Sequence, residues 1–372
     1  MKRQILITGG AGFIGSHVAD ELLDHGYHVR ALDNLTPQVH GTERQRPSYL
    51  APEVELIVGD VCNPADVRKA LAGVDAVLHL AANVGVGQSM YEVTRYTHTN
   101  NLGTAVLLEA LIDSSVERLV VASSMSIYGE GLYRAPDGTM QTVARRDLER
   151  LRSGDWGVYG SDGEHLEPIP TPETKPPDLA SVYALSKFDQ ERMCFIVGRA
   201  YDIPTVALRL FNVYGPRQAL SNPYTGVLAI FAARLLNDNP PLIYEDGYQQ
   251  RDLVSVHDVA RAFRLALEVP EAAGQAFNIG SGRRYTVRQV AESVARALGK
   301  QHLRPQITSK YRVGDIRHCF ADVGQARRVL GYDPQSDLDR DLIALAAWLR
   351  GQQAHDRVSE AQAELATRKL AV

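Results

Sequence analysis

A tyrosine and a lysine spaced for acid–base chemistry lie in the segment SVYALSKFDQERM, at Tyr183 and Lys187. The segment has a helical pattern over 182–200, so two side chains four residues apart share one face. An ammonium beside a phenol favours the phenolate and lowers the phenol pKa from its ordinary value of about 10. We therefore expect Tyr183 to be a general base near neutral pH. A tyrosine and a lysine at a helix surface would be the better interpretation without a cofactor motif.

A glycine-rich turn near the N-terminus supplies such a motif. The stretch ILITGGAGFIGSH is a short apolar strand, a turn that contains Gly9, Gly12 and Gly15, and then a helix. Glycine permits the tight turn and lets backbone N–H groups approach a pyrophosphate, which the positive end of the helix also attracts. We expect a dinucleotide to bind here, with Phe13 and Ile14 beside it.

Two carboxylates follow the next two apolar runs. Asp33, in RALDNL, comes about twenty residues after the turn, where a carboxylate can hydrogen-bond the adenosine ribose. Neither Asn34 nor the next two residues are basic, so a 2′-phosphate would meet a negative charge without a cation, which favours NAD over NADP. Asp60, followed by Val61, is expected beside the adenine. The alternatives are a turn former at Asp33 and a helix N-cap at Asp60.

Strand-like and helix-like segments alternate through the first half of the chain. The apolar runs that predict buried strands are 5–7, 29–32, 56–58, 76–80, 119–122 and 205–210. Helical patterns lie between them at 15–24, 64–72 and 101–112. This alternation predicts a doubly wound parallel α/β sheet of the Rossmann type over 1–211. A smaller α+β substrate-binding domain is expected over 212–350, with some segments returning to the sheet.

Two stretches interrupt this organisation. Residues 130–180 are rich in glycine, proline and charge, and we interpret them as a lid or interface insertion with a short charged helix at 143–151. Residues 351–372 are polar and alanine-rich, and we interpret them as a frayed helix or tail.

Composition narrows the class of protein. The chain has 372 residues and a formal net charge of −4, so no basic excess indicates a nucleic-acid or anionic membrane partner. Its three cysteines are far apart and its histidines lack HExxH spacing, so we expect no disulfide framework and no metal. The N-terminal apolar run is too short for a signal peptide, and we expect a cytoplasmic protein.

The motifs, taken together and in this order, resemble those of the extended short-chain dehydrogenase/reductases, in particular the NAD-dependent nucleotide-sugar epimerases and dehydratases. They are Gly9-x-x-Gly12-x-x-Gly15, Asp33, Asp60, HLAA at 79–82, NNLGT at 100–104, SSMSIYG at 123–129, Tyr183-x-x-x-Lys187 and LRLFNVYGPRQ at 208–218.

The resemblance implies roles for these residues. Tyr183 would be the base, Lys187 would lower its pKa and hold the nicotinamide ribose, and Ser124 would hydrogen-bond the reacting hydroxyl. Ser123 would contact NAD. The remaining implied NAD contacts are Leu80, Ala81, Ala82 and Asn100. Read without the resemblance, ASSMSIYG is a strand end entering a turn.

The resemblance also implies a nucleotide-sugar site in the second half. Asn212 would contact the diphosphate, and Arg251, Arg312 and Asp315 would hold the pyrophosphate and the nucleoside ribose. The planar fork of arginine binds phosphate oxygens in pairs. The alternatives are a turn asparagine and surface ion pairs.

The two residues after Ser124 separate the possible reactions. Dehydratases of this family carry Asp and Glu there, as acid and base for loss of water. Here the positions hold Met125 and Ser126, which are expected to contact the substrate but cannot act as carboxylic acids. We therefore expect epimerisation at C4 through a transient 4-keto sugar, with NAD regenerated and tightly bound.

Further segments are most similar to the dTDP-L-rhamnose 4-epimerase branch. They are AANVGVGQSMYEV at 81–93, GEGLYRAPDG at 129–138 and GPRQALSNPYTGVLAIF at 215–231. Epimerisation of a UDP-hexose or a UDP-uronic acid at C4 is the alternative; a dehydratase, a reductase or a non-catalytic NAD sensor is less well supported. The resemblance also implies a homodimer formed through helices at about 101–113 and 183–200.

Overall fold

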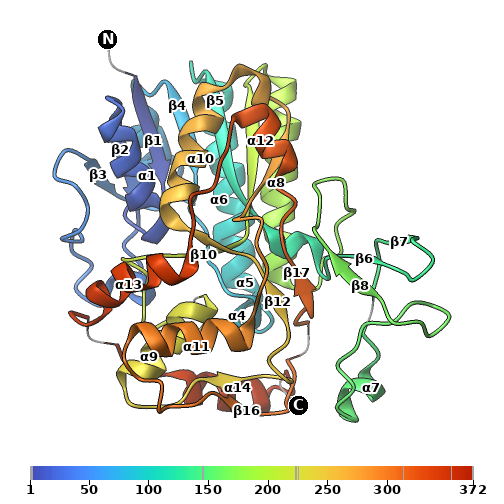
Figure 1. Cartoon of the computed structure of the whole chain (residues 1–372). Helices are drawn as coiled ribbons and strands as arrows, with labels where there is room; N and C mark the ends of the chain where they lie inside the picture. The colour runs from blue at the N-terminus through green and yellow to red at the C-terminus, as the bar shows by residue number, and fades with distance from the viewer. Residues whose placement is uncertain are drawn as a thin grey trace.

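A seven-stranded parallel sheet forms the centre of the molecule, in the order β14-β9-β5-β4-β1-β2-β3 (Figure 1). The computed structural model describes residues 3–144, 146–222, 224, 226–312, 314–352 and 354–370. The strands of the sheet are β1 (Gln4–Thr8), β2 (His28–Asp33), β3 (Glu55–Val58), β4 (Ala76–His79), β5 (Arg118–Ser124), β9 (Thr205–Leu210) and β14 (Ala276–Ile279). Each predicted strand is confirmed. The strand order reverses between β1 and β4, where open α/β sheets bind ligands.

Helices cover both faces of the sheet, which is why its strands are apolar without alternation. In β1, Ile5 and Ile7 pack into one core and Leu6 into the other. The first core is shared by α1 (Phe13–Asp24), α10 (Val256–Glu268) and α12 (Gly324–Leu330). The second is shared by α3 (Pro64–Leu71), α6 (Gly103–Ile112) and α8 (Val182–Ala200).

The predicted helix over 101–112 begins differently from the expectation. A π-helical turn, Thr97–Leu102, precedes α6, and π turns are frequent at functional sites. Short helices before it are α2 (Pro37–His40), α4 (Val86–Ser89) and α5 (Val93–Tyr96), and 3₁₀ turns occur at Met125–Tyr128 and Pro270–Ala272.

A smaller lobe lies beyond one end of the sheet and has its own apolar core (Figure 1). Its helices are α9 (Val227–Leu236), α11 (Val287–Ala297) and α13 (Leu338–Leu349). Its strand pairs are β10 (Asn212–Tyr214) with β13 (Leu253–Ser255), and β11 (Leu242–Ile243) with β16 (Gln306–Ile307). A third sheet joins β12 (Gln250–Arg251), β15 (Tyr285–Thr286) and β17 (His318–Cys319). The domain division near residue 211 stays a proposal. The elements α10, α12 and β14 follow that residue in the sequence, but α10 and α12 pack on the seven-stranded sheet and β14 is part of it.

The insertion at 130–180 is built around a small sheet and projects to one side in Figure 1. Its strands are β6 (Leu132–Arg134), β7 (Met140–Gln141) and β8 (Glu167–Ile169). Its helix α7 (Leu148–Arg152) is shorter and starts later than expected, because the Asp147 carboxylate caps it by accepting from Glu149 N at 2.8 Å.

The C-terminal segment differs from the frayed tail that we expected. It contains α14 (Val358–Thr367), with Ala361 and Leu365 buried. These two apolar residues, four apart, form one face of the helix within an otherwise polar sequence. Within the described part of the chain, every helix is too short or too polar to span a bilayer.

Candidate active site

The carboxyl ends of the strands and the smaller lobe enclose a cavity of about 710 Å³. It is lined by nearly all of the residues singled out from the sequence. These are Gly9, Gly12, Phe13, Ile14, Gly15, Asp33, Asn34, Asp60, Val61, Leu80, Ala81, Ala82, Ser123, Ser124, Met125, Ser126, Tyr183, Lys187, Asn212, Arg251, Arg312 and Asp315. Asn100 is the exception: its buried amide accepts from Asn83 N at 2.7 Å and donates to Ser186 Oγ at 2.9 Å, so it holds neighbouring segments in place.

The glycine turn has the shape that a dinucleotide pyrophosphate requires. A Cβ on Gly15 would lie 2.3 Å from the Gly9 carbonyl oxygen, so only glycine lets α1 begin this close to the strand. Gly9 has a φ of +72°, and a Cβ there would lie 3.0 Å from the Ala81 backbone. Asp33 Oδ2 accepts from Ala11 N at 3.0 Å, which fixes the carboxylate beside the turn. The residues present therefore fit NAD.

Asp60 lies next to the same end of the cavity and is not a helix N-cap. Asn63 caps α3 instead, by accepting from Ala65 N at 3.0 Å. Burial raises the pKa of Asp60, but hydrogen bonds from Cys62 N and the Asn34 amide outweigh it, and the net pKa is lowered. Asp60 is therefore a stable anion that positions Asn34.

Tyr183 and Ser124 meet at the cavity wall. Ser124 ends β5 and accepts from Ser126 N at 3.2 Å. Tyr183 enters at the first turn of α8, which Ser181 caps by accepting from Ala184 N at 3.1 Å. Burial raises the pKa of Tyr183, and the hydrogen bond that its phenol shares with Ser124 opposes the shift only in part.

The Lys187 ammonium hydrogen-bonds a residue of its own helix. Its Nζ donates to Gln190 Oε1 at 2.7 Å, and burial lowers its own pKa to about 8. The net shift is opposite to the expected lowering, because burial dominates and raises the pKa of Tyr183. The role of Lys187 toward Tyr183 with NAD bound stays a prediction. The shared helix face is correct, but the ammonium is held by a partner within α8.

A buried polar network behind Lys187 was not found from the sequence. His79 lies between Thr8 Oγ1 at 2.7 Å and Thr104 Oγ1 at 2.9 Å, and Gln190 Nε2 donates to Thr104 Oγ1 at 2.8 Å. Burial lowers the pKa of His79 to about 3, with a further contribution from Lys187. A histidine at the end of the buried run AVLHL was the available signal. The network joins β1, β4, α6 and α8.

The Ser123 hydroxyl, expected to contact NAD, is used inside the protein. It donates to Glu191 Oε2 at 2.6 Å, and the Glu191 carboxylate pairs with Arg209 at 2.7 Å. Ser123 reaches the cavity wall, but its hydroxyl is committed to this buried ion pair.

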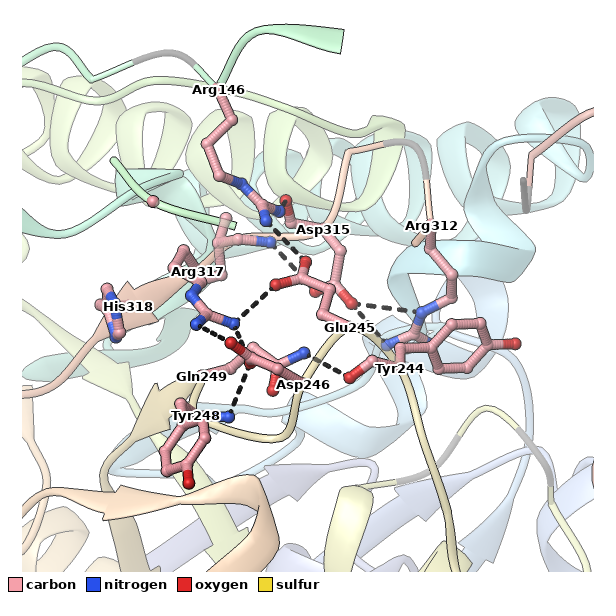
Figure 2. Close-up of polar contacts among 12 residues, drawn as sticks. Arg146, Tyr244, Glu245, Asp246, Tyr248, Gln249, Arg312, Asp315, Arg317 and His318 are labelled. Carbon is pink, nitrogen blue, oxygen red and sulfur yellow. Dashed lines mark hydrogen bonds and ion pairs between the residues drawn. The ribbon is translucent and has the colours of Figure 1, made fainter. Parts of the chain in front are cut away.

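Arg251, Arg312 and Asp315, which predicted the nucleotide end, form one cluster. Figure 2 shows Arg312 beside Asp315. Asp315 Oδ2 accepts from Arg312 at 2.8 Å, and its Oδ1 lies 3.5 Å from Arg251. Burial raises the pKa of Asp315, but the two guanidinium groups outweigh it and hold that pKa at about 2. The Arg312 guanidinium also lies 5.0 Å from the centre of the Tyr244 ring.

Gln249 is a cavity residue that sequence reasoning missed. Its Nε2 donates to the Tyr244 carbonyl at 2.8 Å, whereas its buried Oε1 has no hydrogen-bond partner among the described residues. Asn212, on the same side, donates to the Asp252 carbonyl at 3.0 Å. A buried acceptor without a partner in the cavity wall is consistent with a polar ligand at this end.

A Rossmann sheet, a pyrophosphate turn and a tyrosine–serine pair in one cavity are the features of an NAD-dependent enzyme that acts on a hydroxyl group, and the comparisons identify its family. The chain matches the NAD dependent epimerase/dehydratase family over residues 5–147 and 153–280, and belongs to that family. It is an NAD-dependent nucleotide-sugar epimerase.

Three relatives illustrate the match. The dTDP-L-rhamnose 4-epimerase of Burkholderia thailandensis is 35% identical over 93% of this chain and 95% of its own length. The UDP-glucose 4-epimerase of Mycolicibacterium smegmatis is 31% identical over 93% and 98%. The structure of the UDP-glucose 4-epimerase of Thermus thermophilus complexed with NAD is 31% identical in sequence and has a TM-score of 0.74. The match covers 94% of this chain and 100% of that chain.

Proposed function

We propose that this nucleotide-sugar 4-epimerase acts on dTDP-L-rhamnose, a 6-deoxy sugar. The observation that carries the proposal is a set of apolar residues among those that line the cavity; we call it the apolar wall and assign it to the sugar. Its members are Val84, Val86, Met90, Leu365 and Leu370. The 35% identity to a dTDP-L-rhamnose 4-epimerase supports the same substrate.

Contacts connect this wall to the catalytic pair. Tyr96 packs edge-on against Tyr183, with ring centres 6.4 Å apart, and donates to the Val84 carbonyl at 2.8 Å. Leu365 comes next along the wall, because a Cβ on Gly87 would lie 3.6 Å from Leu365 Cδ2. An apolar wall favours a methyl group over a hydroxyl or a carboxylate, which would lose its hydration there.

The proposed chemistry assigns one task to each residue. When bound, NAD supplies the acceptor for the hydride of the sugar C4 and returns it. Tyr183, as the phenolate, would take the proton of the 4-hydroxyl, and Ser124 would hydrogen-bond the same oxygen. Lys187 would hold the cofactor ribose from its buried position. Met125 and Ser126 provide no acid after Ser124, which supports inversion rather than loss of water.

The substrate is tested with the enzyme as purified, incubated separately with dTDP-L-rhamnose, UDP-glucose and UDP-glucuronate. We expect kcat/KM for dTDP-L-rhamnose to exceed that for the other two by at least about tenfold, because one misplaced polar group costs on that order. The measurement is the rate of epimer formation by NMR. A higher kcat/KM for UDP-glucose would contradict the proposal and favour the UDP-hexose alternative.

We also propose a homodimer through α6 and α8. Leu185 and Ile196 on α8 are 45% and 61% exposed, and their spacing of three turns places them on one face. Ile112, at the end of α6, is also exposed. Apolar side chains that gather on neighbouring helices are typical of an interface.

A further inference from the structure

A cluster of buried and half-buried charges joins the 130–180 insertion to the nucleotide end of the cavity (Figure 2). We call it the charge cluster; its members are Glu130, Arg146, Glu245, Asp246 and Arg317. Glu130 and Arg146 come from the insertion, Glu245 and Asp246 from the loop after β11, and Arg317 from the segment before β17. Three parts of the chain that are distant in sequence therefore meet here.

Arg146 makes the contacts that cross from the insertion. It donates to Glu245 Oε1 at 2.6 Å and to the Asp315 carbonyl at 2.7 Å, and it lies 3.3 Å from Glu130. Its side chain is only 5% exposed. Arg146 therefore contacts Asp315, and the carboxylate of Asp315 pairs with Arg312 and Arg251.

Glu245 is held in an unfavourable backbone conformation to meet this arginine. Its φ is 54°, in the left-handed region where glycine carries no steric cost, and its side chain is 2% exposed. One carboxylate oxygen binds Arg146 and the other binds Arg317 at 2.8 Å. Such strain persists where the surroundings fix it, often at functional sites. The next residue toward the N-terminus, Tyr244, contacts Arg312.

We propose that Arg146 is a positioning residue for the nucleotide, so that the insertion sets the geometry of Tyr244, Arg312 and Asp315. The inference rests on the proposed assignment of that end of the cavity to the nucleoside diphosphate. The insertion thus has a task within the site, because without Arg146 the Glu245 carboxylate loses one of its two arginines and Asp315 loses a backbone anchor.

The test compares Arg146→Met and Arg146→Lys with Arg150→Met in the full-length enzyme. Arg150 lies in the same insertion, and its partner is Asp155 in an exposed ion pair, so it is the matched control. Calorimetry measures the affinity for dTDP and UDP, and steady-state assays give kcat and KM for the nucleotide sugar.

We expect Arg146→Met to weaken dTDP binding and raise KM by about tenfold, the usual coupling of contacting residues, with kcat little changed. Arg146→Lys should recover part of the affinity, and Arg150→Met should match the wild type. Unchanged dTDP affinity in folded Arg146→Met would overturn the proposal, as would equal weakening in Arg150→Met. If Arg146→Met does not fold, Arg146→Lys carries the test, and wild-type affinity in that variant would overturn it. Because dTDP binding needs no turnover, failure of the proposed sugar substrate would be seen separately.

Discussion

Burial, rather than a neighbouring charge, governs the acidity of Tyr183 in this protein. The phenol lies against Ser124 and the Tyr96 ring, and its pKa is raised. Sequence reasoning placed Tyr183, Ser124 and Lys187 correctly around one cavity, because their element types and order were readable. It could not show that Lys187 would bind Gln190, since the choice between two partners within reach depends on packing.

Replacing Tyr183 tests its role as the base. Tyr183→Phe should lower kcat by about 10²- to 10⁴-fold, the usual contribution of a general acid or base, because the phenyl ring keeps the packing and loses the proton acceptor. The readout is the rate of C4 inversion by NMR, with dTDP affinity as a check on folding. Tyr201→Phe, on an exposed tyrosine just after α8, is the control. Wild-type turnover in Tyr183→Phe would refute the assignment.

The His79 network predicts acid sensitivity of the fold. The folded-state pKa is about 3 and the ordinary value is 6.5, so between these pH values the unfolded chain binds a proton that the folded chain refuses. Stability is therefore fully present above pH 6.5 and falls as the pH drops. Because of His79, the free energy of unfolding should fall by about 2 kcal/mol when the pH is lowered from 7.5 to 5.

Urea unfolding of wild type and His79→Gln at these two pH values checks this. The variant should be less stable than the wild type at pH 7.5. On acidification to pH 5, its free energy of unfolding should fall by about 2 kcal/mol less than that of the wild type. The same loss in both proteins would show that His79 is not held neutral.

At the scale of elements, the sheet and its helices could be predicted, because buried parallel strands leave continuous apolar runs and α8 keeps its pattern over 19 residues. The small sheet of the insertion and α14 could not. Their strands and faces are short, and the partners that bury them, such as the cavity rim against Leu365, are distant in sequence.

Leu365 provides the test of α14 as part of the sugar site. Leu365→Gln should lower kcat/KM for dTDP-L-rhamnose by about tenfold, because a polar group would replace the apolar wall. Activity toward UDP-glucose should fall less. Ala363→Gln, on the exposed face of the same helix, should have no effect. Equal losses with both substrates would mean that α14 does not select the sugar.

At the scale of the whole molecule, the cavity lies between the sheet and the smaller lobe, and the proposed dimer can be tested separately from it. Ile196→Asp should convert a dimer into monomers. Burying an unpaired charge in an apolar helix interface would lower the free energy of association by several kcal/mol, on the order of the usual cost of such burial. Light scattering gives the mass in solution. Ile343→Asp alters a still more exposed isoleucine, on α13, and should leave the dimer intact. A monomeric wild type would end the dimer proposal.

The most direct test of the central claim uses dTDP-L-rhamnose carrying deuterium at C4, incubated with the purified enzyme in water without added cofactor. Because the hydride leaves C4 and returns to the same carbon, the inverted product should keep the deuterium at C4, and NMR should show no exchange with solvent. Inversion with loss of the label to water would contradict the account, as would the absence of inversion with this substrate and with the UDP-sugars.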